Sequence, residues 1–353
     1  MDAGLWQRAW TQIASLSLPP VSPDNRSVLT TRTFLTVLLP SFLSYYIAAR
    51  LAISGGAISN RVAFLPVALY TTYKCATSLD LAPREENVRN RWFNNNLVMA
   101  MALCSSRTVT WTFAPTPPRR LDLSSPSSPL QLCLSLRGYG WNWGIPTSRA
   151  PREWRPTSSV TRFVIATNLS VLFHTILFDI LLIHIEYIAP GMWQSPLGAP
   201  ILPPSSYPNL KTTYISFLSF FLVYSSVQII YDTATLIGVT IFRQPPSEWP
   251  PLYDNVLLST SLAQFWGHRY HQIFRQTFAG PFALLPLPVN WRMGGFFIAN
   301  VLGIGLERAW LYLFGTKVGG VAGKIWTVMW LAGWGNWLFD EYSRGAFYDI
   351  KSY

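Results

Sequence analysis

Charged residues, histidines and cysteines are all scarce in this chain of 353 residues. Only 12% of the residues are charged and only four are histidines, whereas 50% are hydrophobic and 16 are tryptophans. So few charges exclude an ordinary soluble protein of this length, and the composition predicts a membrane protein. The three cysteines, Cys75, Cys104 and Cys133, have no paired spacing, so they predict neither a disulfide framework nor a zinc site.

Several common signatures are missing as well. The chain has no phosphate-binding loop, no zinc-protease motif, no serine-hydrolase motif, no internal repeat and no heptad pattern. Residues 1–31 lack the features of a secretory signal. We expect them to form an interfacial N-terminal segment, because apolar residues there follow helical spacing, namely Leu5, Trp6, Ala9, Trp10, Ile13 and Leu16.

Positive charge is the one kind of charge in excess, with a formal net charge of +11. The basic residues lie in loops between apolar stretches, which argues against nucleic acid and favours the cytoplasmic membrane surface and an anionic small substrate. Residues 83–162 are rich in arginine, and Arg84 and Arg162 lie close to apolar stretches. This basic segment is therefore predicted to be cytoplasmic. Its centre, 115–129, is rich in proline and serine and reads as a flexible linker.

Six apolar stretches are long enough to cross a bilayer, at 34–53, 62–79, 160–188, 212–242, 294–314 and 321–339. Shorter apolar stretches, at 97–104, 252–266 and 278–289, are expected to dip into the membrane. The predicted fold class is all-α, a polytopic protein with about six to eight transmembrane or membrane-dipping helices in a single embedded domain over 1–353. An even number of spans puts both termini and the basic loops on the cytoplasmic side, and we expect the endoplasmic reticulum as the location.

The stretch 261–275 contains two of the four histidines. Read as an α-helix, it places polar side chains on one stripe and aromatic or apolar side chains on another: His268, His271, Gln272 and Arg275 against Trp266, Tyr270, Ile273 and Phe274. Such a helix suits the wall of a reaction cavity. No carboxylate or thiolate lies near in sequence, so a metal site is not favoured. A single histidine acting as general base needs fewer assumptions, and the alternative is an amphipathic interfacial helix without chemistry.

A second unusual stretch, 136–144, alternates glycines with aromatic residues. It contains Arg137, Tyr139, Trp141 and Trp143. Such rings suit the headgroup level of a membrane, and the glycines permit a tight backbone. An interfacial turn without chemistry remains an open reading of this stretch.

Ionisable residues within the apolar stretches are candidates for function, namely His174, Asp179, His184, Glu186, Asp232, Glu307 and Arg308. His174, Asp179 and His184 are each five residues apart and do not share a helix face, so a metal site or triad built from them alone is not favoured. For Asp179 and Asp232, function and structural pairing are equally open.

Together, residues 137–143 and 265–275 resemble the two signature stretches of the wax synthase-like family. That family is related to membrane-bound O-acyltransferases and in fungi includes terpenoid acetyltransferases of secondary-metabolite clusters. The second stretch is similar to the pattern Phe-Trp-Gly-Arg-Arg-Trp-His-Gln, in which His271 and Gln272 match. His268 replaces the first arginine of the pattern, and Tyr270 replaces its second tryptophan.

The resemblance implies transfer of an acetyl group from acetyl-CoA to a hydroxyl of a lipophilic terpenoid or meroterpenoid, with membrane lipid around it and no permanently bound cofactor or metal. His271 is the expected general base, with His268 beside it, and Gln272, Asn300 or Trp266 would donate to the oxyanion. The residues expected to bind acetyl-CoA are Arg269, Arg275, Trp266, Arg137 and Trp141.

One departure from the family concerns a further downstream histidine, which its members usually carry. This chain has no histidine after His271. Asn300 and Glu307 are the available substitutes. Two other functions stay open from the sequence: a long-chain wax ester synthase, and a non-catalytic binder or transporter that uses His174, Asp179 and Asp232.

Overall fold

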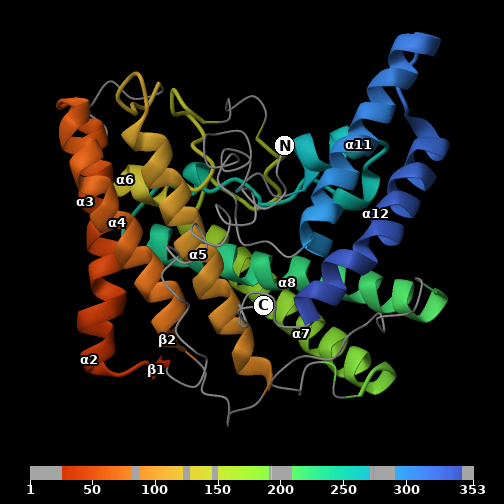
Figure 1. Cartoon of the computed structure of the whole chain (residues 1–353), viewed down its shortest axis with the longest axis horizontal. Coiled ribbons are helices and arrows are strands. Elements are labelled where there is room, and N and C mark those ends of the chain that lie inside the picture. Colours follow the sequence, from red (N-terminus) through yellow and green to blue (C-terminus); the bar gives the residue numbers. More distant parts are fainter. Residues whose placement is uncertain are drawn as a thin grey trace, which may run out of the picture.

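The computed structural model describes residues 26–81, 88–121, 128–144, 150–190, 192, 209–270, 273 and 291–343, and over these residues the chain is mostly helical (Figure 1). The long helices are α3 (Leu39–Ile53), α4 (Ile58–Ser78), α5 (Val88–Thr112), α7 (Val160–Ile188), α8 (Leu210–Thr240), α11 (Trp291–Phe314) and α12 (Gly320–Ser343). The short helices are α2 (Thr31–Thr33), η2 (Phe34–Leu38), α6 (Pro129–Leu134), η4 (Pro246–Glu248), η5 (Val256–Leu258), α9 (Leu262–Gln264) and η6 (Phe265–Arg269).

Helices α3, α4 and α5 stand side by side as one bundle, with α6 against α3 (Figure 1). Hydroxyl pairs link neighbouring helices: Ser44 lies 2.6 Å from Thr71, and Thr72 lies 2.7 Å from Ser105. The two-residue strands β1 (Ser27–Val28) and β2 (Leu79–Asp80) pair in parallel and tie the start of α2 to the end of α4. Short hydroxyl side chains allow these helices to approach closely, so the bundle is held by small polar contacts as well as by apolar packing.

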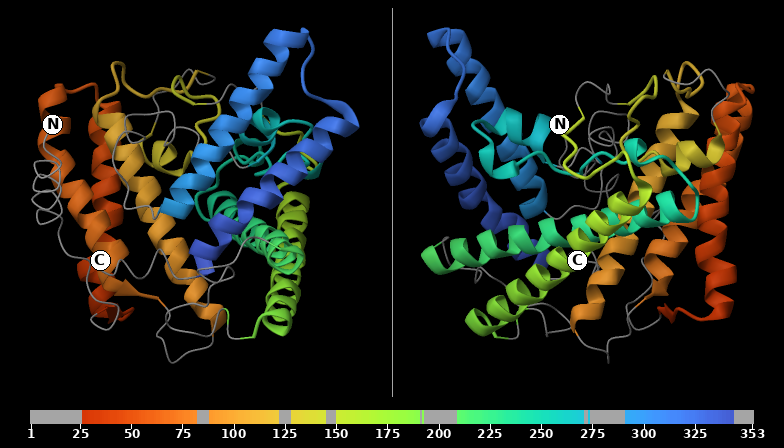
Figure 2. Two further views of the ribbon diagram at one scale, coloured as in Figure 1. Left: turned by 45° about the vertical axis from the view of Figure 1, so that its right-hand side comes forward. Right: turned by 180° about the vertical axis from the view of Figure 1, so that it is seen from behind.

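Helices α7 and α8 pack against each other along their length and cross beneath α11 and α12 (Figures 1 and 2). Each begins with a side-chain cap, from Ser159 and from Asn209 respectively. One face of α7 leaves an apolar row exposed, formed by Ile165, Leu169, Leu172, Phe173, Ile176, Ile180 and Ile183. A continuous exposed apolar face of this kind suits contact with lipid.

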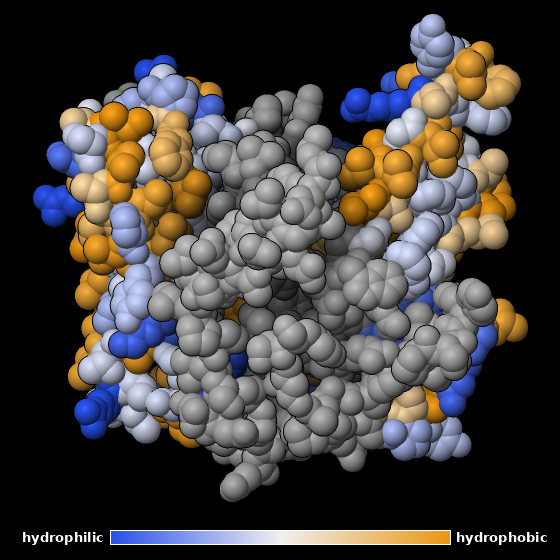
Figure 3. Space-filling view, viewed as in Figure 1, coloured by the Kyte–Doolittle hydropathy of each residue, from blue (hydrophilic) through white to orange (hydrophobic). Residues whose placement is uncertain are grey.

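Helices α11 and α12 pair with each other, and α12 also packs on α8. Asn336 of α12 is fully buried, accepts a hydrogen bond from Ser216 Oγ at 3.2 Å and donates to Thr213 Oγ1 at 3.2 Å. Figure 3 shows apolar side chains gathered over the α3 side of the molecule and over α11 and α12. These polar contacts therefore lie between helices, while part of the apolar surface of α3, α11 and α12 faces outward.

Four helical stretches are long and apolar enough to cross a membrane: Thr31–Ile53, Val160–Ile188, Leu210–Thr240 and Gly295–Phe314. They correspond to four of the six predicted spans, so the mostly helical structure is consistent with the predicted membrane protein. The two other predicted spans form helices of 21 and 24 residues, α4 and α12, which are not among the candidate spans. A total of six to eight spans stays a prediction, and the predicted dip at 278–289 lies outside the described residues.

The structure corrects two of the shorter predicted pieces. Residues 97–104 are the middle of the 25-residue helix α5, which is lengthened at its start by polar residues that find partners in the bundle. Asn94, for example, is buried and donates to Asp80 Oδ1 at 2.6 Å. Residues 252–266 form no single membrane-dipping helix, because Asn255 takes a left-handed conformation with φ of 44° and separates the short helices η5 and α9 from the chain before them.

The contact between α12 and the loop before α9 depends on a glycine. A Cβ atom at Gly323 would collide with the backbone carbonyl oxygen of Thr260. We expect Gly323→Ala to lower the free energy of unfolding by about 1–3 kcal/mol, because backbone has to move to admit the methyl group. Thermal unfolding in detergent measures the effect. The matched control is Gly333→Ala on the same helix, where a Cβ meets no described atom within 4 Å; equal losses in both variants would contradict the prediction.

Candidate active site

The histidine-containing stretch forms a short helix that changes its winding partway along. Ser261 Oγ caps the start of α9 by accepting from Gln264 N–H at 2.9 Å. The helix continues as the π-helical turn η6 and ends when Tyr270 N–H donates to the Phe265 carbonyl at 2.8 Å. Tyr270 is extended, with ψ of 155°. The prediction of one α-helix over 261–275 is therefore wrong at its centre. The wider π-helical turn places residues five apart above each other, so that the Phe265 and Tyr270 rings stack at 5.0 Å, and the helix ends at Tyr270.

The aromatic side of this stretch is largely as predicted. Trp266, Tyr270 and Ile273 all belong to one apolar cluster, together with Phe163, Tyr231, Val239, Trp249, Leu252, Tyr253, Val256 and Phe265. Phe274 lies outside the described residues. Burial raises the pKa of Tyr253 and of Tyr270 well above the ordinary phenol value. Both phenols therefore stay neutral at physiological pH, so the aromatic side of the stretch forms an uncharged wall.

On the polar side, His268 and Arg269 share one carboxylate. His268 Nε2 lies 3.3 Å from Asp254 Oδ2, and Arg269 Nη1 lies 3.8 Å from the same oxygen. Arg269 also donates to the backbone carbonyl of Asp254 at 2.9 Å. The sequence-based assignment missed Asp254, because it lies 14 positions before His268 and sequence alone does not show that the two side chains pair.

Three of the predicted site residues, His271, Gln272 and Arg275, lie outside the described residues. Two others are brought together: Trp266 Nε1 donates to Asn300 Oδ1 at 2.9 Å, and Asn300 in turn donates to the Phe296 carbonyl at 2.8 Å. Asn300 is buried. The indole N–H of Trp266 is thus already engaged, and this bond ties η6 to α11.

Glu307 of α11 holds the start of the motif helix, the short helix that α9 and η6 form together. Its carboxylate accepts from Leu262 N–H at 2.5 Å, from Ala263 N–H at 3.0 Å and from Trp326 Nε1 at 3.0 Å. Backbone N–H groups in the first turn of a helix have no partner within the helix, and a carboxylate there also complements the helix dipole. The carboxylate that the sequence left as a possible substitute base is occupied as a helix cap.

Arg137 is buried rather than presented to solvent. It donates to the carbonyls of Pro250 and Pro251, the latter at 2.7 Å, and to Tyr231 Oη at 2.7 Å. Trp141 is buried as well, and its indole N–H donates to Ser135 Oγ at 2.8 Å. Arg137 therefore joins the first signature stretch to the chain at Pro250 and Pro251, which leads into the histidine-containing stretch. Whether either residue contacts acetyl-CoA stays a prediction.

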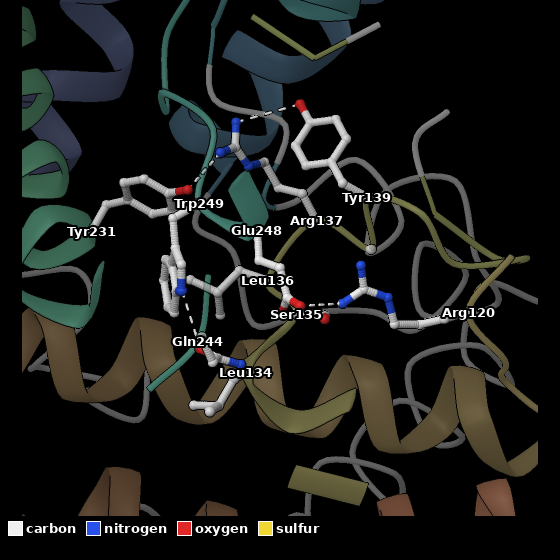
Figure 4. Close-up of a pocket in the computed structure, with 11 residues that line it drawn as sticks. Arg120, Leu134, Ser135, Leu136, Arg137, Tyr139, Tyr231, Gln244, Glu248 and Trp249 are labelled. Atoms are coloured by element: carbon white, nitrogen blue, oxygen red, sulfur yellow. Dashed lines mark hydrogen bonds and ion pairs between the residues drawn. The ribbon is translucent and has the colours of Figure 1, made fainter. Parts of the chain in front are cut away.

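A polar pocket lies at this junction (Figure 4). Its wall includes Arg120, Ser135, Arg137, Tyr139, Gln244, Glu248 and Trp249. Arg120 and Glu248 form an ion pair at 2.7 Å across it, and Trp249 Nε1 donates to Gln244 Oε1 at 3.1 Å. The pocket thus places residues of the glycine-rich stretch beside those that lead into the histidine-containing stretch.

Arg155 is a second buried arginine at this junction. It donates to the Trp249 carbonyl, and Glu153 pairs with it through two bonds, at 2.9 and 3.0 Å. Its Nη1 atom lies 3.8 Å from Asp232 Oδ1, and Ser170 Oγ donates to Asp232 Oδ2 at 2.6 Å. These contacts favour structural pairing for Asp232 over the transport role that the sequence left open. From the sequence, Arg155 was expected only to contribute to the positive charge of the segment 83–162, close to the start of an apolar stretch.

The described cysteines offer little nucleophilic chemistry. Burial raises the pKa of the Cys133 thiol to about 12. A thiol with such a pKa is almost wholly protonated at neutral pH, and it is the thiolate that attacks.

Comparison with known proteins links the junction to a family. Residues 249–298 match the model of the membrane bound O-acyl transferase family. The match begins at Trp249, the residue held by Arg155, and ends in α11, so it contains the whole histidine-containing stretch.

Three curated fungal proteins are similar to parts of the chain. The acetyltransferase spyB of Aspergillus fumigatus is 27% identical over 152 residues, which are 40% of this chain and 25% of that protein. The acetyltransferase sirH of Emericella nidulans is 28% identical over 40% of this chain and 32% of its own length. The acetyltransferase aurG of Calcarisporium arbuscula is 30% identical over 17% of this chain and 14% of its own length.

The aligned parts thus span about a third or less of these curated relatives. No solved structure matches the chain. These findings confirm the resemblance that the two motifs predicted: the chain is similar to membrane-bound O-acyltransferases at residues 249–298 and to fungal acetyltransferases over wider stretches.

Proposed function

We propose that this chain is an integral-membrane O-acetyltransferase that moves the acetyl group of acetyl-CoA to a hydroxyl of a lipophilic terpenoid or meroterpenoid. The observation that carries the proposal is the family match at 249–298, on a segment whose aromatic wall is fixed by two buried arginines and two α11 side chains. The three relatives are named as acetyltransferases, which supports an acetyl donor.

In the proposed reaction both substrates are bound at once. A base takes the hydroxyl proton of the alcohol, the oxygen attacks the thioester carbonyl, the carbon–sulfur bond breaks, and the CoA thiolate leaves and takes up a proton. No enzyme-bound acyl group forms. The match to the family motif makes His271 the first candidate for a histidine at the reacting centre, with Gln272 beside it.

The surroundings support a lipophilic acceptor. The wall of the stretch is aromatic, and apolar faces of α7 and α11 lie open on the outside of the molecule. An apolar alcohol dissolved in the bilayer reaches such a site without crossing water, whereas the anionic acetyl-CoA approaches from the aqueous side. The arginine-rich loops favour the cytoplasmic face of the endoplasmic reticulum for that side.

The test is an assay of membranes that contain the protein, with labelled acetyl-CoA and a panel of terpenoid alcohols. We expect labelled ester from at least one alcohol. A second arm supplies long-chain acyl-CoA and fatty alcohols, and a third measures uptake of the same alcohols without an acyl donor. Preference for the second arm would indicate a wax ester synthase, and uptake without any ester in the other arms would indicate a transporter.

The role of His271 has its own test. We expect His271→Ala to lower kcat at least 100-fold, since a histidine at the reacting centre typically contributes about 10²–10⁴-fold as a general acid or base, or about 10²–10³-fold as a hydrogen-bond donor to the developing oxyanion. The matched control is His184→Ala, because His184 is exposed near the end of α7, where its Nε2 atom lies 3.1 Å from Tyr214 Oη. If His271→Ala inserts normally and turns over as fast as the parent, the assignment is wrong.

A further inference from the structure

We propose that Asp254 and His268 form a carboxylate–imidazole dyad, in which His268 accepts the proton of the alcohol and Asp254 positions the ring. The proposal rests on the acyl transfer proposed above. It answers a question raised by the sequence, which has no histidine after His271. The second histidine of the reacting centre is then His268, which belongs to the histidine-containing stretch and not to α11.

The position of His268 suits contact with a substrate. Its imidazole lies 3.3 Å from Asp254 Oδ2 through Nε2, and 45% of the side chain is exposed, against 21% for Asp254. At the neighbouring Gly267 a Cβ atom would meet no described atom within 4 Å. The ring therefore stands at an open edge of the turn, with its carboxylate partner on the more enclosed side.

The backbone that carries the Asp254 carboxylate is held in place. Asp254 N–H donates to the Arg269 carbonyl at 3.0 Å, and Arg269 Nη1 donates back to the Asp254 carbonyl at 2.9 Å and to that of Asn255 at 3.3 Å. Asn255 supplies the left-handed turn that sets the approach, and asparagine tolerates this conformation better than most residues. These reciprocal bonds close the loop from Asp254 to Arg269 and keep the backbone of Asp254 close to that of His268, the residue before Arg269.

The two residues of α11 that could substitute for the missing downstream histidine already have hydrogen-bond partners. Glu307 accepts three N–H groups, and the Asn300 amide lies between Trp266 and the Phe296 carbonyl. An amide has no basic atom, and a carboxylate that caps a helix is not free to reach a substrate. Among the described residues of the family match, His268 is the titratable group that is both exposed and oriented by a carboxylate.

The chemistry follows from the pairing. An ionised carboxylate only accepts hydrogen bonds, so the neutral imidazole carries its proton on Nε2 and keeps a lone pair on Nδ1. As the O–H bond of the alcohol breaks, Nδ1 takes the proton and the oxygen bonds to the thioester carbonyl carbon. The C–S bond then breaks, the electron pair goes to sulfur, and the imidazolium returns its proton to the thiolate, which gives the ester and CoA.

The test compares kcat and KM in the purified full chain for His268→Ala, His268→Gln, Asp254→Asn and the double variant Asp254→Asn/His268→Ala. We expect each histidine variant to lose at least 100-fold in kcat with little change in KM for acyl-CoA. Asp254→Asn should lose a similar factor, because an amide that donates to Nε2 selects the tautomer with its proton on Nδ1. The double variant should be no slower than His268→Ala alone, since the two residues act as one unit.

Two outcomes would overturn the dyad while the parent chain makes ester. One is a kcat within threefold of the parent in the folded His268→Gln variant. The other is a double variant whose loss is the product of the single losses, which would mean that Asp254 acts independently of His268. A parent chain that is folded and makes no ester is a different result, because it removes the proposed function itself and the dyad with it.

Discussion

Arg155→Met is expected to destabilise the protein by about 3–5 kcal/mol, the usual loss when one partner of a buried ion pair is removed. The side chain is 1% exposed, and its guanidinium contacts the Trp249 carbonyl, Glu153 and Asp232. Methionine fills much of the volume but leaves the Asp232 carboxylate, also 1% exposed, without its cation. Since native stabilities are about 5–15 kcal/mol, much of the folded protein should be lost.

The design separates charge from packing. Adding Asp232→Asn to Arg155→Met should recover part of the loss, because the uncompensated charge disappears while the Ser170 contact can remain. The matched control is Arg152→Met, an exposed arginine on the same approach to α7, which should change little. Thermal unfolding in detergent and the yield of monodisperse protein measure the series. If the single Arg155 variant melts with the parent, the buried network does not stabilise the fold.

Glu307→Leu is expected to impair both stability and turnover. Three donors, two backbone N–H groups of α9 and the Trp326 indole, lose their common acceptor. An unsatisfied buried donor, as the Leu262 N–H would become, costs about 1–3 kcal/mol. The start of the motif helix should loosen, so kcat should fall with stability. Glu307→Gln keeps one acceptor oxygen and should lie between the parent and Glu307→Leu.

The control for this series is Arg308→Gln, at the adjacent exposed position of α11. Thermal unfolding gives the stability, and kcat on the folded fraction gives the turnover. Our expectation is the order Arg308→Gln, Glu307→Gln, Glu307→Leu in rising severity. Full turnover in Glu307→Leu would show that the motif helix keeps its place without this cap.

The long apolar helices could be predicted from the sequence because length and hydropathy are local properties. Helices α7 and α8 have nearly the predicted bounds, at Val160–Ile188 and Leu210–Thr240. Helix α5 could not be predicted, because its polar residues are stabilised by partners far along the chain. Asn94 bonds to Asp80, and Ser105 bonds to Thr72 on α4.

The same division holds at the candidate site. Local sequence was enough to single out the stretch with His268 and its aromatic side. It could not predict the pairing with Asp254, which depends on the turn at Asn255 and on the π-helical winding after Gln264. Nor could it predict that Arg137 is buried and donates hydrogen bonds within the protein, because its acceptors, the carbonyls of Pro250 and Pro251, are more than a hundred residues away.

Two buried arginines, Arg137 and Arg155, bind carbonyls at the very start of the family match. Arg155 contacts Trp249, and Arg137 contacts Pro250 and Pro251. From the other end of the segment, α11 holds the motif helix through Glu307 and Asn300. The histidine-containing turn is thus supported on both sides by groups that do not need to touch a substrate, which is how a precise site is usually kept in place.

The most direct measurement counts products from the purified chain in lipid nanodiscs supplied with acetyl-CoA and an accepting terpenoid alcohol. Direct transfer predicts one molecule of free CoA thiol for each molecule of ester, with neither formed when the alcohol is omitted. CoA release without ester, or no reaction of the folded protein with any acyl donor and alcohol of the panel, would contradict the acyltransferase function.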